Sequence, residues 1–182
     1  MLFQKYKRIC NEHYVQKLRA LDHHCIIHGA THCGKKTLID SAFDSVFVIE
    51  CFSTARETVY RLSNSIKSGN VILLPRIDQK TAIIRKSVCS LIDQFGSHVK
   101  FMVTSTSNTM CNELSSRCGS VHIRRLDRAG KHDVVAYIAR AENIDLSHID
   151  IDSLGSTVHD VLIEIELRLR GCHIRNDWRL YA

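Results

Sequence analysis

The segment with the clearest chemical pattern is IIHGATHCGKKTLID, residues 26–40, in which two glycines and a lysine follow a short apolar run. Four residues separate Gly29 from Gly34, and Lys35 comes directly after the second glycine. This spacing is typical of a phosphate-binding loop, whose backbone N–H groups cradle phosphates while the lysine adds a point charge. The pattern departs at the next position, because Lys36 replaces the expected Mg²⁺-binding hydroxyl and Thr37 follows one residue late.

A nucleotide hydrolase also needs a carboxylate at the end of a neighbouring strand, where it holds Mg²⁺ and polarises water. The candidate strand is VILLPRID, residues 71–78, but Pro75 and Arg76 follow its apolar run in place of two acids. Arginine can neither coordinate Mg²⁺ nor act as a base at neutral pH. Asp78 comes later and we expect it to cap the next helix, which leaves Asp78 and Glu50 as the nearby acids. We therefore predict that this chain's own site does not hydrolyse nucleotide.

The elements that must position these residues alternate between apolar strands and amphipathic helices. Apolar strands bounded by helices predict an α/β fold, a parallel sheet with helices on both faces. After about residue 128 the pattern is helical only, so we predict domains at 1–128 and 129–182. The expected strands are 25–29, 45–51, 70–75, 99–105 and 120–126, and the expected helices begin near residue 11 and cover 35–43, 54–69 and 81–96. Thr54, Glu57 and Gly69 suit the two ends of the helix at 54–69.

Composition narrows the class of protein. The 182 residues contain eight cysteines with no CxxC pair and no zinc spacing, so we expect reduced, mostly buried thiols and no metal site. No run of 18 apolar residues exists, and no apolar segment follows the basic N-terminus, so we expect neither a membrane span nor secretion. The net charge of +6 favours an anionic partner such as nucleic acid, a phosphate ligand or an acidic protein face.

A Ser-Arg-Cys triplet, residues 116–118, stands between the fourth and fifth expected strands. Taken in order, GxxxxGKKT, VILLxxxD, an amphipathic helix with SLIDQF, a strand and SRC resemble the AAA+ subunits of sliding-clamp loaders, most of all the small subunits of replication factor C. The doubled lysine before Thr37 is similar to the subunit-3 type of that family, whose own ATP site is degenerate. The resemblance covers about residues 25–118 and continues more weakly to residue 178.

The resemblance implies a P-loop AAA+ core followed by a small helical lid domain. It implies that ATP or ADP binds at Gly29, Gly34, Lys35, Lys36 and Thr37, and it leaves a role for Mg²⁺ open. In that family the arginine of SRC is a finger that reaches the γ-phosphate of ATP on the adjacent subunit, and Arg117 is the matching residue. Primer–template DNA would lie against the helix start that holds Lys80, Arg85 and Lys86.

Two further family positions depart from the pattern besides Pro75 and Arg76. Ser105 or Thr106 stands where a water-orienting asparagine is expected. The lid sequence GSTVHDVL offers Val158, His159 and Asp160 but no second-sensor arginine. The sequence ends about where the family's oligomerising collar domain would begin. This combination favours a subunit that activates a neighbour without turning over ATP itself.

The expected partners are other clamp-loader subunits, the sliding clamp and primed DNA, and the resemblance implies a nuclear location. Two alternatives remain open: an independent nucleotide-binding protein that uses the AAA+ core, and a structural remnant held in another complex. At the level of single residues, Arg117 could instead be an ion-paired surface arginine. Lys80, Arg85 and Lys86 could equally form a solvated helix face.

Overall fold

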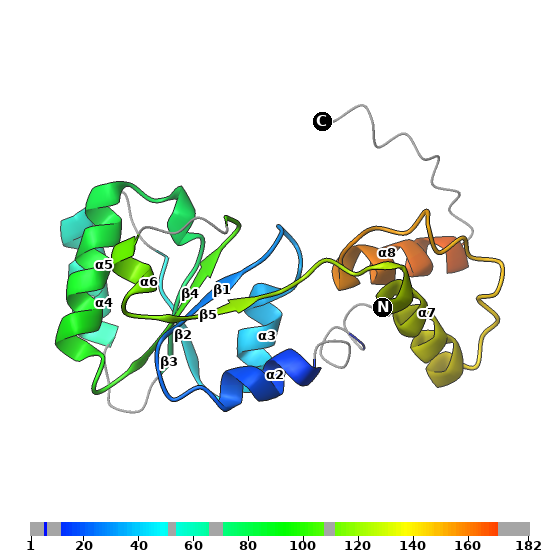
Figure 1. Ribbon diagram of the computed structural model, residues 1–182, viewed down its shortest axis with the longest axis horizontal. Helices are drawn as coiled ribbons and strands as arrows, with labels where there is room; N and C mark the ends of the chain where they lie inside the picture. Colours follow the sequence, from blue (N-terminus) through cyan, green and yellow to red (C-terminus); the bar gives the residue numbers. More distant parts are fainter. Residues whose placement is uncertain (1–5, 7–11, 51–53, 66–70, 108–111, 171–182) are drawn as a thin grey trace. The chain divides into compact units, whose positions relative to one another are not determined.

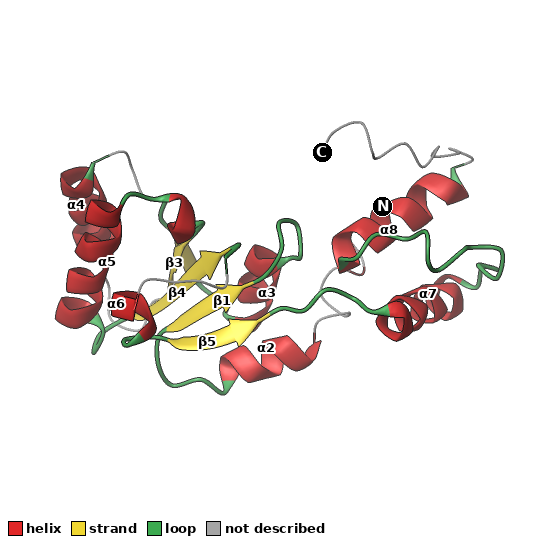
Figure 2. Cartoon of the chain, turned by 45° about the horizontal axis from the view of Figure 1, so that its top comes forward, coloured by secondary structure: helices red, strands yellow, loops and turns green. Residues whose placement is uncertain are grey.

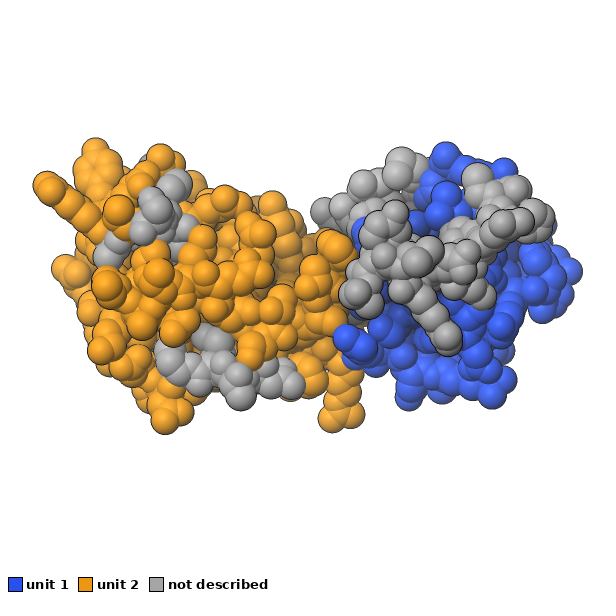
Figure 3. Space-filling model, turned by 90° about the horizontal axis from the view of Figure 1, so that it is seen from above, with its two compact units in different colours: residues 1–10, 125–182 blue, residues 11–124 orange. Residues whose placement is uncertain are grey.

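The computed structural model describes residues 6, 12–50, 54–65, 71–107 and 112–170. They fall into two compact units, residues 11–124 and residues 125–182 together with 1–10 (Figure 3). The division follows Arg124, four residues before the boundary that the sequence pattern suggested, and Tyr6 belongs to the second unit.

The first unit is built on a five-stranded sheet in the order β2-β3-β4-β1-β5 (Figure 1). All four pairings are parallel, and Ile26 of β1 lies opposite Val103 of β4 and Ser120 of β5. The chain order reverses between β1 and β4, which is where open parallel sheets bind ligands beyond their strand ends. The strands are β1 Cys25–His28, β2 Val46–Val48, β3 Val71–Leu74, β4 Lys100–Ser105 and β5 Gly119–His122.

Helices cover both faces of this sheet (Figure 2). Alternate strand residues point to opposite sides, so each face has its own apolar cluster. Ile26 and Phe101 pack under α5 Ala82–Phe95 and the short helix α6 Asn112–Ser115. Ile27 and Met102 pack against the other face. That face carries α2 Glu12–Arg19 and α3 Lys35–Ala42, while α4 Ala55–Ser65 lies beside α5. The predicted α/β fold with helices on both faces is confirmed.

Two helix starts are fixed by threonine caps. The Thr54 hydroxyl oxygen accepts a hydrogen bond from the Glu57 N–H at 3.3 Å, which confirms that predicted cap; Gly69 lies outside the described residues. Thr81 caps α5 by accepting from the Ile84 N–H at 3.4 Å. The expectation that Asp78 caps this helix is therefore wrong, since Asp78 lies earlier, in the 3₁₀ turn η2 Ile77–Gln79.

The second unit is helical in its described part, with α7 Arg128–Glu142 and α8 Val158–Leu169. Asp127 caps α7 through the Gly130 N–H, and Thr157 caps α8 through the Asp160 N–H. The two helices share a buried core that includes Tyr6, whose ring meets Tyr137 edge-on. None of the helices in the described ranges is long and apolar enough to cross a membrane.

Candidate functional site

The loop after β1 has the backbone shape that its glycines predict. Gly34 adopts a left-handed conformation (φ 86°, ψ 18°) directly before α3, which suits glycine because it has no Cβ. At Gly29 a Cβ would lie 2.7 Å from the Cys33 Sγ and 3.1 Å from the Ile123 carbonyl oxygen. Both glycines are therefore required by the fold of the loop itself, and the N-terminal N–H groups of α3 open into it.

Lys35 folds back over this loop. Its Nζ donates to the carbonyl oxygens of Gly29 and Ala30, both at 2.7 Å, and lies 3.7 Å from the Cys33 Sγ. These bonds satisfy the half-buried ammonium within the chain. A phosphate that entered the loop would take over this charge, so the loop carbonyls and an anion compete for Lys35.

The two residues after Lys35 do not rebuild the missing Mg²⁺ position. Lys36 is exposed, and Thr37 is half-buried one step further along α3. One helical step turns a side chain by about 100° around the axis, so the Thr37 hydroxyl faces a different direction from a hydroxyl at position 36.

The end of β3 also differs from a hydrolase. Arg76 is exposed and its backbone is left-handed (φ 52°, ψ 48°), with its N–H donating to the Thr104 hydroxyl oxygen at 3.0 Å. The chain therefore turns away from the strand at the position where a catalytic acid would stand. Pro75 before it supplies neither an acid nor an N–H.

Asp78 is used to join two strand ends. One carboxylate oxygen accepts from both the N–H and the hydroxyl of Thr106, while the other oxygen, Oδ1, is buried with no hydrogen-bond partner among the described residues. Burial raises the pKa of Asp78, but the Thr106 hydrogen bonds outweigh it, so the pKa lies below the ordinary value.

This pair leads to a pH-dependent prediction. Asp78→Asn should lower the free energy of unfolding at pH 7 by about 1 kcal/mol, because a charged acceptor binds Thr106 more strongly than an amide does. A depressed carboxyl pKa adds stability above the unfolded pKa of about 4, and this stability is lost as pH falls through the folded pKa. Urea unfolding should show the difference from wild type shrinking as pH falls below about 5 and through the folded pKa of Asp78. Asp40→Asn, on the exposed face of α3, is the matched control, and a difference that stayed constant with pH would contradict this role.

The strand ends do not fit a Mg²⁺ ion. Within the described ranges no three histidine, cysteine or acidic side chains are grouped as metal ligands would be. Glu50 follows β2 at the sheet edge and is exposed, with β3 and β4 between it and the loop after β1. A single carboxylate at Asp78 is a poor replacement for the oxygen cage that Mg²⁺ takes.

Two positions were compared with the resembling family, one expected to hold a water-orienting asparagine and one a lid arginine. Both are occupied by groups that serve the fold. Ser105 is fully buried and donates its hydroxyl to the Ser107 carbonyl oxygen at 2.9 Å, while Thr106 binds Asp78. His28 Nδ1 lies 2.9 Å from the same Ser107 oxygen. In the helical unit, Val158 is buried in the core at the first turn of α8, so this position presents no charge.

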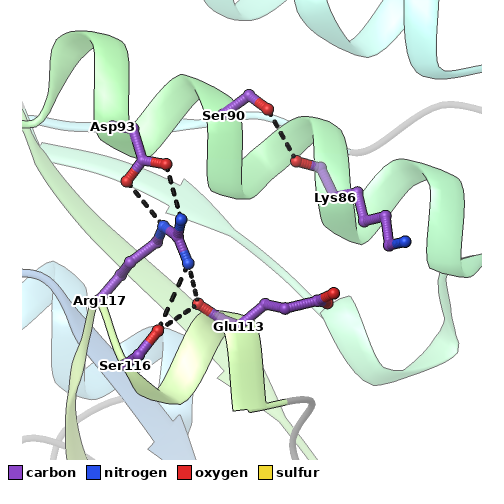
Figure 4. A network of polar contacts seen from close by, with 6 residues as sticks. All are labelled: Lys86, Ser90, Asp93, Glu113, Ser116 and Arg117. Atoms are coloured by element: carbon purple, nitrogen blue, oxygen red, sulfur yellow. Dashed lines mark hydrogen bonds and ion pairs between the residues drawn. The ribbon is translucent and has the colours of Figure 1, made fainter.

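Arg117 is a partly exposed side chain with a well-defined set of partners (Figure 4). Its Nε and Nη2 donate to the two carboxylate oxygens of Asp93 at 2.7 and 2.8 Å. Its Nη1 donates to the Glu113 carbonyl oxygen at 2.7 Å and to the Ser116 hydroxyl at 3.4 Å. The ion-paired state considered from the sequence is therefore present, although 32% of the arginine side chain remains exposed.

Arg117 and the phosphate-type loop lie at opposite ends of the parallel strands. The loop follows the C-terminal end of β1, whereas Arg117 precedes the N-terminal end of the neighbouring strand β5. The four residues of β5 span roughly 13 Å. This separation keeps Arg117 away from its own loop, so a phosphate held by that loop is out of its reach.

The three basic residues suggested for DNA lie around the start of α5, beyond the C-terminal end of β3. This is the same end of the strands as the loop after β1. Lys86 is exposed, while Lys80 and Arg85 are half-buried. Arg85 Nη1 also donates to the Lys80 carbonyl oxygen at 2.7 Å, so part of its donor capacity serves the turn. Lys86 and the Lys80 ammonium therefore have more freedom than Arg85 to meet phosphates.

No protein-family model matches this sequence, and no curated protein matches it either. Solved structures of RuvB from Thermotoga maritima are similar to it. One, titled as a Holliday junction branch migration motor, has a TM-score of 0.63 at 13% identity, over 97% of this chain and 65% of that chain. A mutant of the same protein has a TM-score of 0.64 at 14% identity, over 93% of this chain and 61% of that chain.

This similarity, together with the five-stranded parallel sheet, shows that the chain has the α/β fold of those RuvB structures. At this identity the likeness extends to the fold alone. The chain spans less than two thirds of the length of those RuvB chains.

Proposed function

We propose that this chain is a non-hydrolysing subunit of a DNA sliding-clamp loader, similar to the small subunits of replication factor C. The observation that carries the proposal is the separation of Arg117 from the chain's own loop by the length of β5. The chain has no acids directly after β3, but it has a partly exposed arginine at the other end of the strands, before β5. That arrangement suits a group that acts on a neighbour's ATP.

In this proposal each set of residues has a separate task. Gly29, Gly34 and Lys35, with Lys36 and Thr37 beside them, hold the phosphates of ATP or ADP, which stays bound without being turned over. Arg117 places its planar charge against the γ-phosphate on the adjacent subunit, where charge develops during phosphoryl transfer. Lys80, Arg85 and Lys86 contact DNA phosphates through sequence-independent electrostatics.

The partners would be other loader subunits, the sliding clamp and primer–template DNA, in the nucleus. The test is to purify the chain with the proteins that bind it and measure ATP hydrolysis with and without primed DNA. We expect negligible hydrolysis by the chain alone and DNA-stimulated hydrolysis by the complex. Hydrolysis by the chain alone that is lost in Lys35→Ala would overturn the proposal in favour of an independent nucleotide-using enzyme.

Nucleotide binding by the loop can be tested separately. Lys35→Ala should weaken ATP or ADP binding by about 10- to 100-fold, because a hydrogen bond to a charged group contributes about 1.5–3 kcal/mol. Titration calorimetry on the purified chain measures this. The matched control is Lys17→Ala, which removes the same charge from an exposed side chain of α2 and should change affinity by less than about three-fold. If the unaltered chain binds no nucleotide at millimolar ATP, the loop is a remnant whose lysine serves only its own carbonyls.

A further inference from the structure

We propose that Asp93 is a parking site for Arg117: it holds the guanidinium inside its own chain until a phosphate on a neighbouring subunit displaces it. This inference rests on the proposed function, because it assigns a resting position to the proposed finger. The observation behind it is the two-pronged pair between Arg117 and Asp93, which brings together residues 24 positions apart.

In the paired state, most of the hydrogen-bond donors of Arg117 are already in use. A guanidinium carries five N–H donors in a fixed planar fork. In Arg117 the Nε–H and one Nη2–H bind Asp93, and the Nη1 group binds the Glu113 carbonyl and the Ser116 hydroxyl. One Nη2–H of the five is left over, so Arg117 cannot grip a phosphate with two parallel bonds while it stays in this position.

The surroundings explain why the arginine rests here. Asp93 lies in the last turn of α5, where the helix dipole already presents partial negative charge and disfavours an acid. The Glu113 carbonyl belongs to α6 and Ser116 directly follows this helix, so Arg117 also satisfies a carbonyl near a helix C-terminus. Lys86, further back on α5, points away from the pair in Figure 4. Arg117 is thus the cation that offsets the negative charge at this corner, and it holds the pKa of Asp93 below its usual range.

The strength of the pair decides what kind of device it is. The Asp93 side chain is 53% exposed and the Arg117 side chain 32% exposed, so water and salt weaken their attraction. Exposed pairs of this kind shift an equilibrium by only about two- to five-fold. Arginine fingers raise the rate of phosphoryl transfer by about 10³–10⁵-fold. The phosphate charge that develops in this reaction therefore attracts the Arg117 guanidinium far more strongly than Asp93 does. The pair therefore tunes how often the finger is available and does not block it.

The first measurement uses this chain by itself. Phenylglyoxal, which modifies free guanidinium groups, is applied to the unaltered chain and to Asp93→Asn, and the rate at Arg117 is followed by mass spectrometry. We expect the rate to rise about two- to five-fold in Asp93→Asn and to return to the original value in Asp93→Glu, which restores the charge. Glu57→Gln, which breaks the exposed Arg61–Glu57 pair on α4, is the matched control and should leave Arg117 unchanged.

The second measurement uses the complex that co-purifies with the chain. Asp93→Asn should raise its ATP hydrolysis without DNA by the same about two- to five-fold at limiting ATP, and the effect should shrink at high salt. The double variant with Arg117→Ala should match Arg117→Ala alone, because Asp93 acts only through Arg117.

The outcomes separate the two proposals. An unchanged phenylglyoxal rate in Asp93→Asn overturns the parking site and leaves the finger role standing. Hydrolysis that falls in Asp93→Asn also overturns it, because Asp93 would then orient the finger for catalysis. If the phenylglyoxal rate rises but neither Asp93→Asn nor Arg117→Ala alters hydrolysis, the finger role itself is overturned, and the parked state has no catalytic purpose.

Discussion

Replacing Arg117 with alanine should lower ATP hydrolysis at the neighbouring site of the assembled complex by about 10³-fold or more, while the negligible activity of this chain alone stays unchanged. The reason is electrostatic, because a fixed planar charge stabilises the charge that develops on the γ-phosphate. Steady-state ATP hydrolysis of the complex measures the effect, and the total rate should fall by at least the share of the one site that this chain serves.

Two variants make this result specific. Arg117→Lys keeps the positive charge but loses the planar fork, so most of the loss should remain. Arg61→Ala removes an equally charged arginine from α4, 3.5 Å from Glu57, and should leave hydrolysis unchanged. Equal rates for the unaltered complex and for the complex that carries Arg117→Ala would rule out a finger in trans.

Replacing Phe101 with alanine should lower the free energy of unfolding by about 3–5 kcal/mol, a large part of the roughly 5–15 kcal/mol that holds a typical domain together. Phe101 is fully buried on β4 among residues of β1, β3 and α5, and its ring meets His24 edge-on at 5.4 Å. Removing the ring leaves a cavity under α5, the helix that carries Arg85, Lys86 and Asp93. Urea unfolding measures the loss.

The comparison for Phe101 is an apolar residue of the same unit that the fold does not use. Ile83 is 70% exposed in the first turn of α5, so Ile83→Ala should stay within about 0.5 kcal/mol of the unaltered chain. Hydrogen exchange at the β4 amides shows whether the unit of residues 11–124 is the part affected. A loss below about 1 kcal/mol for Phe101→Ala would mean that the core collapses around the missing ring.

Local patterns predicted most of the fold. The strand expected at 25–29 is β1 Cys25–His28, and the helix expected at 35–43 is α3 Lys35–Ala42, because apolar runs and the glycines around the loop are strong local signals. The strand expected at 120–126 was too long, because the observed strand β5 ends at His122. The Arg124 N–H donates to the Tyr14 hydroxyl and so makes no hydrogen bond to the neighbouring strand. The short elements α6 and η2 were missed, because turns of three or four residues carry little periodicity.

The site was predictable in its residue types and unpredictable in its contacts. The glycine spacing fixes the loop, and the missing acids are visible in the letters of residues 71–78. The Arg117–Asp93 pair joins two elements that are distant in sequence. From the sequence, Asp93 was predicted only to lie on an amphipathic helix. The return of Lys35 to its own loop carbonyls also depends on the folded loop, so no sequence pattern indicated it.

The left-handed backbone at Arg76 affects any attempt to build a Mg²⁺ site at the end of β3. An Asp-Glu pair introduced at positions 75 and 76 would stand on a backbone that is already turning into η2 and that bonds to Thr104. The carboxylate at position 76 would therefore leave the direction of the strand. A design that adds hydrolysis to this chain would have to rebuild the turn after β3 together with the two side chains.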